Sequence, residues 1–156
     1  MPEIRLDQVD RRILDHLQAH ARATTLELAE AAQLSPAQCN RRHRRLEQLG
    51  LIARYETRLD AKGLGLHVVA FVSVVMERGH NRELGRFKAL VGDLTQIQEC
   101  YAVTGDADYV LKVVARDLKS LSDFLMDTLM RTPGVHTVRS TVCLDEIKCT
   151  SALPLG

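Results

Sequence analysis

Four arginines stand close together in the first third of the chain, at positions 41, 42, 44 and 45, with His43 between them. A guanidinium group donates hydrogen bonds in a planar, two-pronged geometry that fits a phosphate or the major-groove edge of guanine. All ten basic residues before position 60 are arginine, with no lysine among them. These residue types indicate contact with nucleic acid. An isolated charge run is usually a solvated helix face, however, so only the sequence around it can distinguish that interpretation from contact with nucleic acid.

The arginines lie between a helix start and a helix stop. Ser35 and Gln38 have the spacing of a capping box, in which each side chain bonds to the other residue's backbone N–H, and Pro36 suits the first helical position. Gly50 tolerates the left-handed conformation that ends a helix. The pattern predicts a short, well-capped helix with a basic surface, which is what a major-groove reading element requires.

Two further helices are predicted before the basic one. Asp7 can cap a helix over residues 7–20 whose apolar side chains share one face. Thr24 and Glu27 form a second capping box, which opens a short helix. Three helices within about 45 residues, the last two joined by a turn of a few residues, predict a helix-turn-helix.

The pattern changes after the basic helix. Residues 51–59 alternate weakly in polarity and predict a short strand pair, or wing, and residues 60–66 contain two glycines and predict a hinge. Beyond the hinge, apolar and β-branched runs predict strands over 68–76, 97–104, 108–115 and 135–149, with helices over 81–93 and from Asp117 onward. The order βαββαβ predicts a ferredoxin-like sheet with both helices on one face.

We therefore expect an α+β protein with a helix-turn-helix domain over residues 1–59, a hinge over 60–66 and a ferredoxin-like domain over 67–156. The uncovered face of the predicted sheet is also rich in apolar residues. A monomer rarely exposes so much apolar area, so we expect a second copy of the chain to cover this face.

The turn between the second and third predicted strands contains Gly105, Asp106 and Asp108. A glycine–aspartate pair can simply make a hairpin turn. Exposed backbone N–H groups and a nearby carboxylate would also bind the carboxylate and the ammonium group of a free amino acid. On the residues alone both interpretations stay open.

The composition argues against several other classes of protein. No apolar stretch approaches the roughly 18 residues that a membrane-spanning helix needs, and the N-terminus shows no signal sequence, so we expect a soluble cytoplasmic protein without membrane contact. The net charge of +1 argues against coating nucleic acid through bulk charge. The four cysteines include no C-x-x-C pair and no histidine lies at a metal-finger spacing from them, which favours reduced thiols.

Two other classes of protein could be built from the same elements. An enzyme on a ferredoxin-like scaffold would need an activated nucleophile or a metal constellation, and no such spacing occurs in the sequence. We therefore expect no catalytic residue, no metal and no cofactor. An architectural DNA-wrapping protein without an effector would share the same arginine helix, and only an amino-acid titration separates it from a DNA-binding protein that senses an amino acid.

The order of domains and several short motifs resemble the Lrp/AsnC family (leucine-responsive and feast/famine regulators) over about residues 6 to 150. The matching motifs are Leu6-Asp7 with Asp10-Arg11-Arg12-Ile13-Leu14, Leu34-Ser35-Pro36, Arg44-Arg45-Leu46-Glu47 with Gly50-Leu51-Ile52, Thr104-Gly105-Asp106-Ala107-Asp108-Tyr109, and Pro133-Gly134-Val135. The resemblance implies a transcription regulator that binds double-stranded DNA and senses an amino acid. It also implies a dimer that assembles further into tetramers or octamers.

The resemblance carries over to particular residues. It implies an amino-acid effector at Gly105, Asp106 and Asp108, at the dimer interface, and the weaker candidates for the pocket wall are Ala102, Leu118, Thr141 and Val142. For DNA, the start of the basic helix enters the groove first, which places Ser35, Ala37, Gln38, Asn40, Arg41 and Arg42 at or near base edges and leaves Arg44 and Arg45 for phosphates.

Two positions depart from the family pattern. Position 40 often holds a larger apolar residue and is Asn40 here, and position 43 usually holds a small aliphatic residue facing the core and is His43 here. His43 is either a tolerated core histidine, which we favour, or turned toward DNA. No operator sequence therefore follows from the resemblance.

Overall fold

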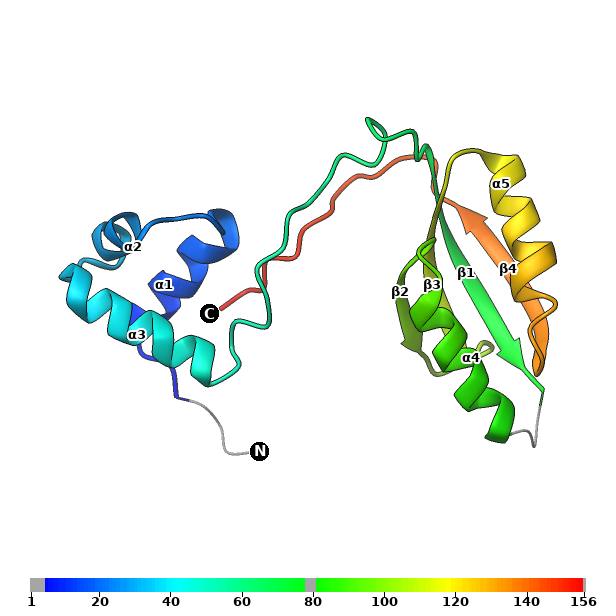
Figure 1. The fold of residues 1–156 in the computed structure, drawn as a ribbon, viewed down its shortest axis with the longest axis horizontal. Coiled ribbons are helices and arrows are strands. Elements are labelled where there is room, and N and C mark those ends of the chain that lie inside the picture. Colours follow the sequence, from blue (N-terminus) through cyan, green and yellow to red (C-terminus); the bar gives the residue numbers. More distant parts are fainter. Residues whose placement is uncertain (1–4, 78–80, 156) are drawn as a thin grey trace. The chain divides into compact units, whose positions relative to one another are not determined.

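The computed structural model describes residues 5–77 and 81–155, which form two compact units (Figure 1). One unit contains the chain up to Arg58 together with Lys148 and the residues after it, and the other contains Leu59–Ile147. From the sequence we expected residues 148–156 to belong to the second domain. Residues 148–155 group with the first because the backbone of Leu153 bonds to Gln18 and because Leu155 packs against the helical core.

The first unit contains three helices, α1 (Gln8–Ala19), α2 (Thr25–Ala32) and α3 (Pro36–Gln48). Both predicted capping boxes are formed, at Thr24 with Glu27 and at Ser35 with Gln38. The side chains that all three helices bury against one another are Ile13, Leu14, Leu17, Leu28, Ala29, Ala32, Cys39 and Leu46. This arrangement confirms the predicted helix-turn-helix.

The segment that follows α3 differs from the prediction. Among the described residues, 51–59 form no strand, so the expected strand pair is absent from the segment. Tyr55 instead turns back onto α3, where its hydroxyl donates a hydrogen bond to Glu47 Oε1 at 3.0 Å. Side-chain contacts with the helix, rather than a backbone ladder, fix this part of the chain.

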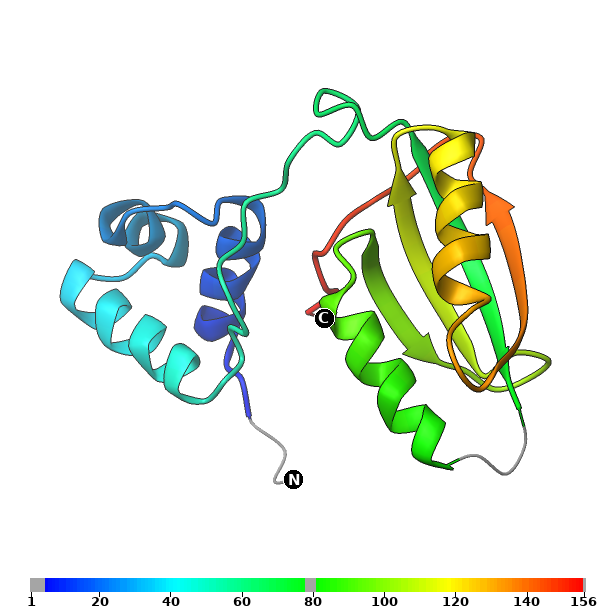
Figure 2. The same cartoon turned by 45° about the vertical axis from the view of Figure 1, so that its right-hand side comes forward.

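The second unit is a four-stranded antiparallel sheet with the strand order β2-β3-β1-β4. Its elements in chain order are β1 (Val68–Met76), α4 (Asn81–Asp93), β2 (Ile97–Ala102), β3 (Tyr109–Ala115), α5 (Leu118–Asp123), which continues as the π-helical segment η1 (Phe124–Leu129), and β4 (Val135–Val142). The helices lie on one face of the sheet (Figure 2), as the βαββαβ order predicted. β4 ends at Val142 rather than at Cys149, because the chain leaves the sheet after Cys143 donates to Val69 O at 2.8 Å.

The two faces of the sheet differ in burial because side chains alternate along a strand. On β1, Ala70, Val72 and Val74 are fully buried under the helices, whereas Phe71 on the opposite face is 46% exposed. The strand pairings place the following residues on that opposite face, which we call the open face: Val69, Phe71, Ser73, Val75, Glu99, Tyr101, Val110, Lys112, Val114, Thr137, Arg139 and Thr141.

Candidate nucleic-acid interface and effector site

The structure brings the predicted DNA-binding residues together on α3 and its cap. Ser35, Ala37, Gln38, Asn40, Arg41, Arg44 and Arg45 are exposed, and Arg42 is half-buried. The buried residues of α3 are Cys39 and Leu46. At 3.6 residues per turn, Ala37, Arg41 and Arg44 lie on the side of the helix opposite to them.

The four arginines divide into two pairs. Arg42 Nη1 lies 2.7 Å from Asp7 Oδ2 and 2.8 Å from Asp10 Oδ1, and Arg45 Nη1 lies 3.2 Å from Asp10 Oδ2. The side chain of Asp10 is only 2% exposed, so both of its oxygens depend on these arginines. Among the described residues, Arg41 and Arg44 form no ion pair. One pair therefore ties α3 to α1, and the other is directed at solvent.

Hydrogen bonds at the start of α1 hold Asp7 in its charged form. The backbone N–H of Asp10 donates to Asp7 Oδ1 at 2.8 Å, and this bond, followed by the one from Arg42, lowers the pKa of Asp7. A hollow of about 300 Å³ opens beside this contact and is lined by Asp7, Arg41, Arg42 and Arg45. Arg45 is half-exposed there, so it keeps donors for an anion while it holds Asp10.

His43 faces the chain that follows α3. Its Nε2 lies 2.6 Å from Tyr55 Oη, and the two rings meet edge to face. Burial, followed by the hydrogen bond to Glu47, raises the pKa of Tyr55 to about 12, so the phenol keeps its proton at neutral pH. Because that proton goes to Glu47, His43 Nε2 acts as the donor to the Tyr55 oxygen. His43 is thus a half-buried partner of Tyr55, a contact that sequence reasoning missed.

The predicted effector turn lies at the end of the hairpin between β2 and β3. Gly105 is exposed and has a φ of +112°, a conformation that disfavours a side chain. Asp108 joins the turn to β1: its Oδ2 accepts from Met76 N at 2.7 Å, and its own N–H donates to Val74 O at 3.0 Å. Asp106 is exposed beside them. Asp108 is therefore a structural residue of the turn, and Oδ1 is the oxygen left for a ligand.

The remaining effector candidates do not all lie near this turn. Ala102 ends β2 opposite Tyr109 and belongs to the same end of the sheet as the turn. Thr141 pairs with Phe71, and Val142 pairs with Ala70, near the start of β1. The turn meets β1 at Val74 and Met76, so about 10–20 Å of strand separates the two groups at roughly 3.3 Å per residue.

Leu118 belongs to the far group, because it follows the end of β3 at Ala115, which pairs with Val68 at the start of β1. One chain therefore does not unite Leu118, Thr141 and Val142 with Gly105, Asp106 and Asp108 in a single pocket. The strand register that separates them is set by long-range pairing, which the sequence pattern did not specify.

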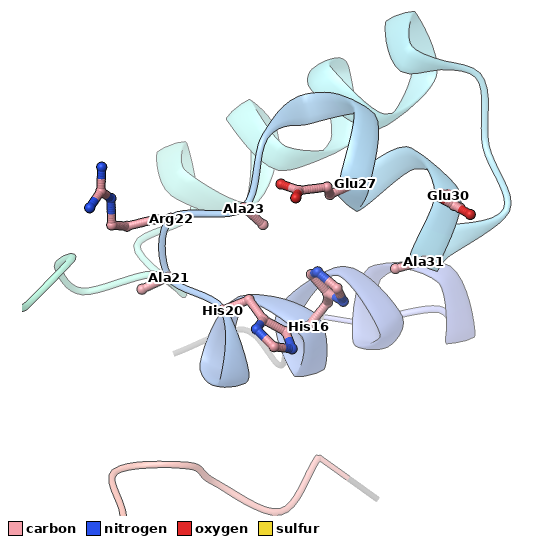
Figure 3. Close-up of a pocket in the computed structure, with 8 residues that line it drawn as sticks. All are labelled: His16, His20, Ala21, Arg22, Ala23, Glu27, Glu30 and Ala31. Carbon is pink, nitrogen blue, oxygen red and sulfur yellow. The ribbon is translucent and has the colours of Figure 1, made fainter.

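A second hollow, of about 670 Å³, lies between the end of α1 and α2 (Figure 3). Its lining residues are His16, His20, Ala21, Arg22, Ala23, Glu27, Glu30 and Ala31, none of which was predicted to bind DNA or effector. The rings of His16 and His20 lie 4.8 Å apart between centroids. Within the described ranges, no three histidine, cysteine, aspartate or glutamate residues are grouped so that they could hold a metal ion. In the same ranges, no helix is long and apolar enough to span a bilayer.

Comparison with known proteins matches both units. A family model described as "Lrp/AsnC ligand binding domain" matches residues 69–153, and one described as "Winged helix-turn-helix DNA-binding" matches residues 6–53. The leucine-responsive regulatory proteins of Salmonella typhimurium and Escherichia coli K12 are each 38% identical to the chain over 148 residues. The alignment covers 95% of this chain and 90% of each relative.

Solved structures agree with these matches. A transcriptional regulator from Neisseria meningitidis, solved as a complex with L-Met, is similar with a TM-score of 0.94 at 36% identity over 97% of both chains. LrpC of B. subtilis is similar with a TM-score of 0.83 at 32% identity, covering 93% of this chain and 99% of that one. The chain therefore belongs to the Lrp/AsnC family and is a DNA-binding transcriptional regulator, not an enzyme, with a winged helix-turn-helix domain followed by an effector-binding domain.

Proposed function

We propose that the outer face of α3 reads DNA and that its four arginines have three different roles. The observation that carries this proposal is their division into Arg41 and Arg44, which form no ion pair within the described part of the chain, and Arg42 and Arg45, which hold Asp10. Arg41 reads bases together with Ser35, Ala37, Gln38 and Asn40, and Arg44 and Arg45 bind phosphates. Arg42 would have to leave two carboxylates to reach a base, so we assign it to holding α3 in place.

Alanine at positions 41, 42 and 44 tests this assignment. We expect Arg41→Ala to weaken the free energy of binding by about 1–3 kcal/mol on a duplex that the wild type selects from a random pool, and by much less on a scrambled duplex. Arg44→Ala should weaken both duplexes alike and reduce the slope of log affinity against log salt by about 1. Titrations at several salt concentrations measure both effects.

The control for these variants is Arg86→Ala, an exposed arginine on α4 that should leave both duplexes unaffected. Arg42→Ala should lower the free energy of unfolding of the helical domain as well as DNA affinity. Equal losses on both duplexes for Arg41→Ala would remove it from the base-reading set. A stable Arg42→Ala variant with altered sequence preference would restore Arg42 to that set.

We propose further that two copies of the chain meet through the open face of the sheet and present paired recognition helices to DNA. The apolar part of this face is centred on Phe71 of β1, which lies between β3 and β4 in the sheet. The buried core of an interface is enriched in such aromatic and aliphatic side chains. Tetramers and octamers would be built from these dimers.

The effector is proposed to be an amino acid that binds where two sensor domains meet. Three observations support this: the ligand-binding family model, the L-Met bound to the Neisseria relative, and the exposed glycine turn with a carboxylate oxygen to spare. The two groups of candidate residues lie at opposite ends of one sheet, so only a second copy could bring them into one pocket. The effector then shifts the assembly or the spacing of the recognition helices.

Asp108 gives the test of the effector site. Asp108→Ala would also remove the acceptor for Met76 N–H, so Asp108→Asn is the sharper variant because its amide oxygen retains that bond. A thermal-shift screen with the twenty amino acids, beginning with L-Met, should show a responsive ligand, since ligand at 100 times Kd stabilises the native state by about 2.7 kcal/mol. Asp108→Asn should lose that shift and keep its DNA affinity.

The matched control is Asp93→Asn, an exposed aspartate at the end of α4 that should respond to the ligand as the wild type does. An unchanged shift in Asp108→Asn would show that this carboxylate does not bind the ammonium group of the effector.

A further inference from the structure

The chain passes between its two units twice. It leaves the helical unit after Arg58 and returns to it at Lys148 (Figure 1). Within the sensor unit, β4 ends at Val142, and Cys143 makes the last backbone bond to β1. The residues that return, 148–155, form no helix or strand of their own. Their position therefore depends on the contacts they make with the helical unit.

Gln18 of α1 makes the first of these contacts. Its Nε2 donates to Leu153 O at 3.1 Å, and its Oε1 accepts from Leu153 N at 2.5 Å. One amide side chain thus satisfies both backbone groups of Leu153, much as a neighbouring strand would. The Leu153 side chain is 69% exposed, so its backbone makes this contact.

Two further contacts hold the returning segment. Leu155 is half-buried and packs against the core of the three helices. Arg58 donates to Cys149 O at 3.2 Å and also contacts Cys149 Sγ. The outgoing and returning segments are therefore joined at the border of the helical unit. The outgoing one is also held three residues earlier, where Tyr55 bonds to α3.

We propose that residues 148–155 are a strap that ties the DNA-binding domain to the sensor domain with a second stretch of chain. The segment from 59 to 67 alone, if flexible, would span on the order of 15–18 Å with free rotation about its ends. A second connection closes a loop and removes most of those orientations. The strap restricts where α3 can lie relative to the sensor domain, and it thereby sets the half-site spacing that a dimer accepts.

The functional part of this inference rests on the proposed pairing of two copies on DNA, whereas the docking of the strap does not. The test uses full-length protein carrying Gln18→Ala and Leu155→Ala together, with Gln18→Ala alone as a milder variant. The matched controls are Gln8→Ala, an exposed glutamine on α1, and Leu153→Ala, which removes an exposed leucine and keeps its backbone bonds. Circular dichroism checks that each variant is folded.

Hydrogen exchange reports the docking. The Leu153 amide should be protected in the wild type and both controls, and should exchange at least tenfold faster in the double variant. If the Leu153 amide exchanges as fast in the wild type as in the double variant, the strap does not dock. The same conclusion follows if the amide stays protected in a folded double variant.

DNA binding tests whether the strap restricts the position of α3 relative to the sensor domain. The duplexes are a single half-site and a paired site, both selected by the wild type, and the paired site with five base pairs inserted to rotate one half-site by about half a turn. The insertion should lower the affinity of the wild type at least tenfold and that of the double variant less than threefold. The two proteins should bind the single half-site with equal affinity. If the insertion lowers the affinity of the double variant as much as that of the wild type, the strap does not restrict the position of α3. If the insertion does not lower the affinity of the wild type, the pairing of two copies on DNA is contradicted, and so is the restriction that the strap would impose on α3. Hydrogen exchange would then still test whether the strap docks on the helical unit.

Discussion

Replacing Asp10 with alanine is expected to lower the free energy of unfolding of the helical domain by about 2–3 kcal/mol. Asp10 is the only charged side chain among those that the described residues bury, and both of its oxygens accept from arginines of α3. Breaking a buried ion pair usually costs about 3–5 kcal/mol because a charge is left without its partner. Here Arg45 can turn to water and Arg42 keeps Asp7, which places the expected cost below that range.

Urea unfolding of the full chain, followed through the helical signal, measures this loss. A small domain has only about 5 kcal/mol or somewhat more to lose, so we also expect weaker binding to every DNA sequence at 37 °C. Asp15→Ala is the matched control, because Asp15 is exposed on the same helix and should change stability by less than about 0.5 kcal/mol. Equal stability of the Asp10 and Asp15 variants would show that the arginines do not depend on the buried carboxylate.

The helices of the first unit could be predicted from the sequence because their signals are local. The capping boxes at Thr24 and Ser35 involve residues three apart, and both are formed as predicted. Asp10 also carried a local signal, since it lies on the same face of α1 as Ile13, Leu14 and Leu17. A carboxylate on an apolar face requires a buried partner, which would have directed attention to the arginines of α3.

The division of roles among the arginines was not predictable in the same way. Arg41 and Arg42 are neighbours in sequence, and only the crossing of α1 and α3 decides which of them meets Asp10. The strand pair predicted over 51–59 does not form for a related reason, because two short strands are stable only where other elements pack against them. The strap was missed because its few contacts show no periodicity and reach back to Gln18 across 135 positions.

The grouping of the predicted effector residues could not be foreseen from the sequence, because it depends on strand register. The order of strands and helices followed from β-branched runs and turn residues, and the structure has that order. Register decides which ends of the strands meet, and it separates Thr141 from Asp108 along β1. Neither residue type nor spacing along the chain carried that information.

Replacing Phe71 with arginine is expected to dissociate the proposed dimer. Phe71 is 46% exposed on an interior strand, and its neighbours across the strands are Lys112 and Thr141. An arginine buried there would lie beside Lys112, whose carboxylate partner Glu99 is already paired with it at 3.3 Å, so the added charge would cost about 2–3 kcal/mol or more. A two-fold interface contains the substitution twice, so the dimer constant should weaken by roughly 10³–10⁴.

Sedimentation velocity over a range of concentrations measures this change, and Met126→Arg is the matched control. Met126 is 61% exposed on η1, which packs on the helical face of the sheet, so its substitution should leave the mass unchanged. A Phe71→Arg variant with the wild-type mass would exclude the open face as the interface and would require another surface to join the copies. If the variant is monomeric, its affinity for a single half-site should be retained while its affinity for a paired site falls steeply. The reason is that binding of the second half-site depends on the effective concentration that the dimer provides.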